Sequence, residues 1–133
     1  MDDALRAFVK ARAGGRCEYC QFPEAASFLP FAIDHVIAEK HRGPTAEANL
    51  AWSCYYCNSY KGPNIAGWIP ETDEVVRLFH PRRHDWDDHF VWEGAILLPR
   101  TAIGRVTIDV LEINLADAIA VRQELIDMGG IVR

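Results

Sequence analysis

The four cysteines of this 133-residue chain constrain its fold more than any other feature. They form two Cys-x-x-Cys pairs, Cys17/Cys20 and Cys54/Cys57, and no cysteine is left over. A Cys-x-x-Cys turn presents two sulfurs to one metal ion, and two such pairs complete the closed tetrahedral set of thiolates that structural zinc prefers. The spacing therefore predicts a structural zinc site that ties the two segments together.

Two other interpretations of the cysteines stay open. A thiol redox protein needs only one Cys-x-x-Cys pair, and neither pair lies in the βαβ pattern of a thioredoxin-like motif. Two disulfides would suit an exported protein, but the N-terminal residues lack the basic start and apolar stretch of a signal peptide. We therefore predict a cytoplasmic protein. We also predict no membrane association, because no apolar run approaches the roughly 18 residues of a membrane span.

Local patterns predict a single α+β domain over residues 1–133. Residues 1–62 would hold the zinc knuckle and a core of two strands and a helix, and residues 63–133 would form a C-terminal extension with a hairpin and a helix. In the first part we expect a helix over about 2–13, a strand within 28–37, a short strand over 49–53 and a helix over about 54–61. In the second part we expect irregular structure over 64–88, a hairpin of 89–98 with 103–113, and a last helix capped by Asn114.

Residues that suit catalysis lie between and beside the cysteine pairs. The carboxylate of Asp34 suits a hard cation such as Mg²⁺, and the neutral imidazole of His35 suits general-base work near neutral pH. Neighbouring strand residues point to opposite faces, so both can line one site only at a strand end or a distorted edge. Asn58 follows Cys57 directly and could supply a second metal ligand, while Asn49 could orient the His35 ring.

Taken in order, these fragments resemble an HNH endonuclease of the four-cysteine kind. They are Cys-Glu-Tyr-Cys at 17–20, Asp-His at 34–35, Asn-Leu at 49–50, Cys-Tyr-Tyr-Cys-Asn at 54–58 and Lys-Gly at 61–62. The resemblance covers about residues 14–62. It implies a ββα-metal core, in which two antiparallel strands and a helix surround one catalytic metal ion. Residues 63–133 resemble, less specifically, the tail of a bacterial subgroup of the family.

The resemblance also implies a role for each catalytic residue. His35 would be the general base that activates water for attack on a phosphodiester. Asp34 and Asn58 would bind a catalytic Mg²⁺ or Mn²⁺, and Asn49 would hold His35 in place. The implied activity is endonucleolytic hydrolysis of DNA, with RNA as the less favoured substrate.

The charge distribution bears on how such a protein would meet DNA. The formal net charge is −5. Residues 1–62 carry as many basic as acidic residues, so the deficit lies in residues 63–133. Lys61 and Arg82 are candidate substrate contacts, although Lys61 could equally be the cation at a helix C-terminus. The acidic tail predicts weak phosphate-driven binding and a separate partner that targets the chain to DNA.

Two matters stay open at this point. The chain could act as a monomer or as a homodimer. The alternative function is a catalytically inactive, zinc-stabilised module that binds nucleic acid or another protein. The sequence favours the enzyme because Asp34, His35 and Asn58 are all present, and an inactive module has no need to keep all three.

Overall fold

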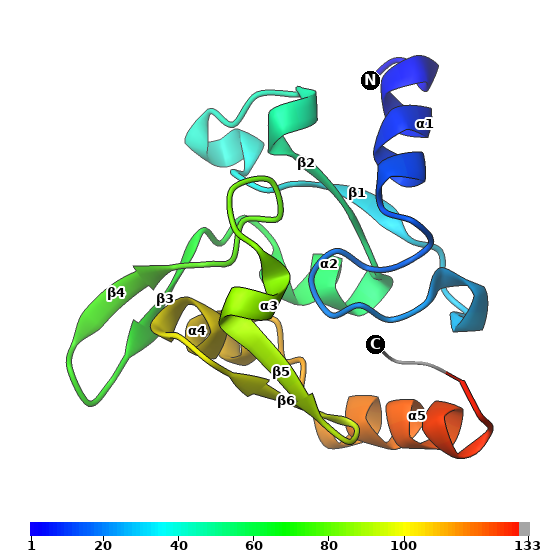
Figure 1. The fold of residues 1–133 in the computed structure, drawn as a ribbon. Helices are drawn as coiled ribbons and strands as arrows, with labels where there is room; N and C mark the ends of the chain where they lie inside the picture. Colours follow the sequence, from blue (N-terminus) through cyan, green and yellow to red (C-terminus); the bar gives the residue numbers. More distant parts are fainter. Residues whose placement is uncertain (131–133) are drawn as a thin grey trace.

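The computed structural model describes residues 1–130 and shows a mixed helix and strand fold (Figure 1). Three two-stranded antiparallel sheets are formed by β1 (Ala32–His35) with β2 (Leu50–Ser53), β3 (Ala66–Ile69) with β4 (Glu74–Arg77), and β5 (Phe90–Glu93) with β6 (Ile96–Pro99). The helices are α1 (Asp3–Arg12), α2 (Tyr55–Lys61), α3 (Trp86–His89), α4 (Ala102–Val110) and α5 (Ala116–Asp127), with short 3₁₀ turns at Glu24–Ala26, Glu39–His41 and Glu47–Asn49. The predicted α+β class is confirmed. Within residues 1–130 no helix is long and apolar enough to cross a membrane.

Residues 3–61 follow the predicted order of helix, strand, strand and helix. Asp2 caps α1 by accepting a hydrogen bond of 2.7 Å from the Leu5 N–H. In the β1–β2 hairpin Asp34 pairs with Ala51, and His35 is the last residue of β1. Both α1 and α2 pack against this hairpin. The hairpin and α2 therefore form the ββα unit that the resemblance implies.

The predicted structure of the C-terminal half is wrong in two places. Residues expected to be irregular contain the β3–β4 hairpin. The hairpin expected between 89–98 and 103–113 lies entirely within 90–99, where Gly94 and Ala95 form its two-residue turn. Gly94 has a φ of +60°, as such turns require. Most of the second predicted strand is the helix α4.

Tertiary contacts explain why α4 forms despite its β-branched residues. Thr101 caps the helix by accepting a 3.1 Å bond from the Gly104 N–H. Thr107, fully buried, donates to the Ile103 carbonyl at 2.7 Å and accepts the Phe79 N–H at 2.8 Å. Gly104 lies so close to α3 that a Cβ would meet the His89 carbonyl oxygen at 2.1 Å. Packing of this face against β3, β4 and β6 therefore outweighs the local strand preference.

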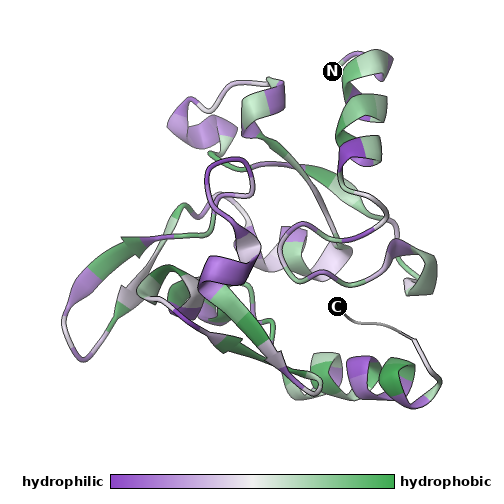
Figure 2. Ribbon diagram, in the orientation of Figure 1, coloured by the Kyte–Doolittle hydropathy of each residue, from purple (hydrophilic) through white to green (hydrophobic). Residues whose placement is uncertain are grey.

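The last helix forms as predicted, but its predicted cap is wrong. The Asn114 side chain accepts a hydrogen bond from the Leu97 N–H at 3.0 Å and donates one to the Leu97 carbonyl at 2.8 Å. It therefore fixes the segment before α5 to β6. On α5 the buried Arg122 donates to the Ala95 and Ile113 carbonyls, both at 2.9 Å. Figure 2 shows hydrophobic residues along β5 and β6, whereas the loop before α3 is hydrophilic.

The two halves of the chain share one cluster of buried apolar side chains. Its members include Tyr19 and Leu50 from the first half and Phe79, Phe90 and Leu97 from the second. A polar contact adds to this packing, since the Trp86 indole N–H donates to the Tyr19 carbonyl at 2.8 Å. The C-terminal extension thus packs directly on the first Cys-x-x-Cys turn, residues 17–20.

Candidate metal centre and active-site pocket

The four cysteine sulfurs form one buried cluster. All four Sγ atoms lie within 4.8 Å of one another, and those of Cys20 and Cys54 are 3.8 Å apart. Four sulfurs at about 2.3 Å from a tetrahedral zinc ion would be separated by about 3.8 Å. In the part of the chain that the structure describes, this is the only group of His, Cys, Asp and Glu side chains placed to hold a metal ion. The cluster therefore fits the predicted closed metal site and supports a structural zinc.

The backbone and the charges around the sulfurs also favour a cation. The Cys17 Sγ accepts the Cys20 N–H at 3.5 Å, and the Cys54 Sγ, at the N-cap of α2, accepts the Cys57 N–H at 3.4 Å. Hydrogen bonds with the other thiols, above all that of Cys17, lower the pKa of Cys54 and raise the pKa of Cys20 and Cys57. The thiols thus compete for negative charge, whereas a bound cation would let all four ionise.

Asp34, His35 and Asn58 line one pocket of about 260 Å³ at the meeting of β1 and α2. His35 ends β1, so the alternation of strand side chains does not separate it from Asp34. Asn58 comes from the middle of α2, next to Cys57 of the sulfur cluster. The structure therefore brings together three of the four residues for which the sequence predicted catalytic roles, and Asn49 does not line this pocket.

The expected contact between Asn49 and the His35 ring is replaced by a different arrangement. The His35 Nε2 atom lies 2.9 Å from the Thr45 hydroxyl. The buried Asn49 side chain instead accepts the Ile37 N–H at 2.9 Å and donates to the Ile37 and Pro44 carbonyls at 3.0 and 2.9 Å. Asn49 thus closes the loop that carries Thr45, and Thr45 contacts the ring. The sequence offered no signal for Thr45 beyond its place in a polar loop.

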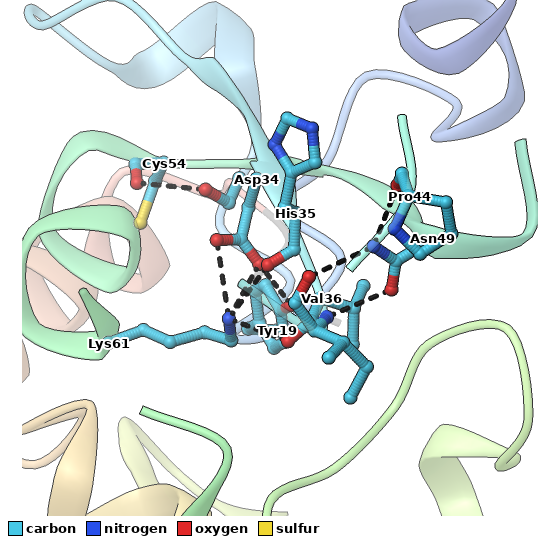
Figure 3. Close-up of polar contacts among 10 residues, drawn as sticks. Tyr19, Asp34, His35, Val36, Pro44, Asn49, Cys54 and Lys61 are labelled. Carbon is cyan, nitrogen blue, oxygen red and sulfur yellow. Dashed lines mark hydrogen bonds and ion pairs between the residues drawn. The ribbon is translucent and has the colours of Figure 1, made fainter. Parts of the chain in front are cut away.

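Lys61 does not occupy the surface position expected of a phosphate contact. Its side chain is fully buried, and its ammonium lies 3.1 Å from Asp34 Oδ2 and 3.3 Å from Oδ1 (Figure 3). It also donates to the carbonyls of His35 and Val36 at 3.2 and 3.0 Å. Lys61 is therefore an internal counter-ion, and its expected role as a substrate contact is corrected.

The Asp34 carboxylate has a second buried partner that sequence reasoning missed. The Tyr19 hydroxyl, in the first Cys-x-x-Cys turn, donates to Asp34 Oδ2 at 2.6 Å. Burial raises the pKa of Asp34, and the charge of Lys61 and the bond from Tyr19 offset only part of that rise. Between residues 17 and 20 Tyr19 could be read only as a spacer, because nothing local indicates what its side chain meets.

Of the two expected phosphate contacts, Arg82 is also engaged within the protein. Its guanidinium pairs with the Glu18 carboxylate, and burial lowers the pKa of Arg82 to about 10. The exposed Lys40, which the sequence analysis did not single out, lines the pocket together with Asp34, His35 and Asn58. Its place in the polar loop that follows the predicted strand was the available signal.

Comparison with known proteins addresses the same segment. Residues 17–64 match the sequence model of the family described as HNH endonuclease. No curated protein and no solved structure matches the chain significantly. The matched segment begins at the first cysteine and contains the other three, the β1–β2 hairpin and α2. Residues 17–64 of this chain are therefore an HNH endonuclease family domain, with four cysteines positioned to bind a metal ion.

Proposed function

We propose that the chain is an endonuclease that hydrolyses phosphodiester bonds in DNA at the pocket of Asp34, His35 and Asn58. The observation that carries the proposal is the convergence of these three side chains on one pocket of a ββα unit. The family match supports a nucleic-acid substrate. The choice of DNA over RNA, the cytoplasmic location and the single-domain organisation remain predictions from the sequence.

His35 is the general base in this proposal. If Nε2–H donates to the Thr45 hydroxyl, Nδ1 is the basic nitrogen left to accept a proton. That nitrogen takes a proton from water as the water oxygen bonds to phosphorus. One phosphorus–oxygen ester bond breaks, the departing oxygen takes a proton from solvent water and leaves as an alcohol, and the His35 imidazolium returns its proton to the solvent. Asn49 acts indirectly, by fixing the loop that carries Thr45.

Asp34 and Asn58 are the residues that would hold a catalytic Mg²⁺ or Mn²⁺. Among residues 1–130 the single polar contact of Asp34 Oδ1 is the one at 3.3 Å to Lys61, so this oxygen keeps capacity for a cation. A carboxylate and an amide oxygen beside an open pocket fit a hard cation that also takes water and phosphate ligands. Such an ion would stabilise the charge that develops on the scissile phosphate and the leaving oxygen.

A further proposal concerns substrate binding. Lys40 is the cationic side chain that lines the pocket, and its exposure lets it reach a phosphate without breaking an ion pair seen in the structure. We assign it the phosphate contact first expected of Lys61 and Arg82. A single lysine and the acidic C-terminal half are consistent with weak intrinsic binding, and hence with a targeting partner.

Cleavage of supercoiled plasmid with Mg²⁺ or Mn²⁺ tests the proposal. The comparison is wild type against His35→Ala, with His41→Ala as the matched control, because His41 is an exposed histidine on the neighbouring turn. Zinc content and folding are verified for all three. We expect cutting by wild type and His41→Ala but not by His35→Ala. Equal cutting by all three would remove His35 from its role, and inactivity of all three with every metal would reject the nuclease.

The inactive binding module remains the alternative, and one observation favours it. The ammonium of Lys61 already neutralises the carboxylate that would bind the catalytic cation. A module without catalysis predicts nucleic-acid binding that divalent cations do not change. The thiol redox protein is disfavoured by four buried sulfurs gathered at metal-binding distances, and a stoichiometric zinc content in the purified protein would reject it.

A further inference from the structure

One side chain of the first Cys-x-x-Cys turn contacts Asp34, which lines the proposed catalytic pocket. Tyr19 lies between Cys17 and Cys20, is fully buried, and donates its hydroxyl to Asp34 Oδ2 at 2.6 Å. We propose that Tyr19 is a positioning residue through which the zinc knuckle sets the orientation of the Asp34 carboxylate for cation binding. The inference rests on the proposed function, since it assigns Asp34 to the catalytic cation.

The two oxygens of the carboxylate are not equivalent. Oδ2 accepts the Tyr19 hydroxyl at 2.6 Å and lies 3.1 Å from the Lys61 ammonium, whereas Oδ1 has, within the described part of the chain, only the longer 3.3 Å contact to Lys61. The side of the carboxylate with the shorter contacts is thus held by the protein, and Oδ1 is left for an external ligand. Asp34 lines the pocket that Asn58 also lines, so a cation there has two oxygen donors available.

Tyr19 can orient the carboxylate because its own position is fixed at three points. Its backbone N–H lies 3.4 Å from the Cys17 Sγ, so metal binding by the cysteines holds the residue. Its carbonyl accepts the Trp86 indole N–H at 2.8 Å, so the C-terminal half holds it from another direction. Its side chain is fully buried within the apolar core. A rotation of the hydroxyl away from Asp34 would therefore require movement of the knuckle.

The expected size of the effect follows from the chemistry of ligating carboxylates. A hydrogen-bond donor to the non-coordinating oxygen fixes the orientation of the carboxylate without removing its charge. Loss of such an outer partner typically lowers metal affinity or activity by about 10- to 100-fold. Lys61 differs from Tyr19 in this respect, because its positive charge competes with the cation for Asp34. The hydroxyl is therefore the contact whose loss should weaken cation binding.

The test measures Mn²⁺ binding to the zinc-loaded protein. The electron paramagnetic resonance signal of free Mn²⁺ reports how much of the ion stays unbound. Tyr19→Phe is compared with wild type and with Tyr55→Phe, which removes a hydroxyl from an exposed tyrosine of α2. We expect Tyr19→Phe to keep its zinc and bind Mn²⁺ about 10- to 100-fold more weakly, and Tyr55→Phe to match wild type. Equal Mn²⁺ affinity in Tyr19→Phe and wild type would overturn the inference, whatever the change in thermal stability.

A second measurement needs no variant and applies even if Tyr19→Phe does not fold. The cysteine site of the wild type is loaded with ¹¹³Cd, and Mg²⁺ is added while the cadmium resonance is observed. A shift that saturates with Mg²⁺ supports the coupling, and an unchanged resonance overturns it. Plasmid cleavage separates the two proposals. Weaker Mn²⁺ binding by Tyr19→Phe with an inactive wild type would reject only the nuclease, and an active wild type with equal Mn²⁺ affinities would reject only the role of Tyr19.

Discussion

Replacing Lys61 by methionine should cost far more stability than removal of a surface lysine. The Lys61 side chain is fully buried and Asp34 is 6% exposed, so the ion pair lies almost entirely out of water. Methionine keeps most of the side-chain volume but leaves the carboxylate and two carbonyl groups without their cation. Removal of one partner of a buried pair typically costs about 3–5 kcal/mol, because the other charge stays buried and uncompensated. The whole free energy of unfolding of a typical protein is about 5–15 kcal/mol, so a loss of this size is large.

The assay is urea unfolding at pH 7 with zinc present, and the matched control is Lys40→Met. We expect Lys40→Met to lie within about 0.5 kcal/mol of wild type. The double variant Asp34→Asn/Lys61→Met no longer buries an unpaired charge. It should therefore recover part of the free energy of unfolding that Lys61→Met loses, with a coupling energy of up to about 3 kcal/mol. If Lys61→Met lost less than about 1 kcal/mol, Lys61 would not be a buried counter-ion. The phosphate role would then return to consideration.

The pH dependence of the same variant has a definite sign. Burial already raises the pKa of Asp34, and the charge of Lys61 is the main influence that lowers it. Without Lys61 the pKa of Asp34 in the folded state should rise further above its unfolded value. A raised folded pKa means that the folded state takes up the proton more readily, so acid favours folding of the variant relative to wild type. The stability deficit of Lys61→Met should therefore shrink as the pH falls through the folded pKa of Asp34.

Three further predictions concern other parts of the molecule. Burial lowers the pKa of Arg122, and the charges of Cys20, Cys57 and Cys54 oppose that shift, so Arg122→Leu should bind zinc about 10- to 100-fold more weakly than wild type in competition with a chromogenic chelator. If Lys40 contacts a phosphate, Lys40→Ala should weaken binding to all DNA sequences alike and lower the slope of log K against log salt by about 1. Burial, and then the nearby arginines, lower the pKa of His80 to about 4. In urea titrations wild type should therefore lose about 2 kcal/mol more than His80→Gln between pH 7 and pH 5, because the unfolded histidine gains a proton there and the folded one does not.

The sequence allowed residues 3–61 to be predicted well because the signals there are local. Asp2 caps α1 and is followed by apolar residues at helical spacing. Gly62, with a φ of +50°, ends α2 directly after the predicted last residue of that helix. The cysteine pairs add a constraint that reaches across more than thirty residues, because four thiolates must meet at one point. Each element is thus defined either by its own residues or by the metal-binding pattern.

Residues 103–113 show where local reasoning failed. The segment is rich in β-branched residues, which favours a strand when its neighbours are ignored. Its apolar positions Ile103, Val106 and Val110 also recur at helical spacing, and Thr101 stands at the N-cap position. That weaker signal describes the actual helix. The helix is favoured by the tertiary contacts of Gly104 with α3 and of Thr107 with Phe79 in the segment after β4, and those contacts lie outside any local window.

The grouping of Asp34, His35 and Asn58 around one pocket was predictable from the sequence, but their partners were not, and Lys61 shows why. A lysine in the last turn of a helix normally complements the helix dipole at the surface, and nothing local suggests otherwise. Its burial follows from the end of β1, where the carbonyls of His35 and Val36 and the carboxylate of Asp34 all face one point. Once α2 covers these acceptors, they need a group that can donate several hydrogen bonds, and an ammonium can donate three. The residue type that binds a phosphate at a surface is therefore also the one that satisfies this interior, and only the fold distinguishes the two.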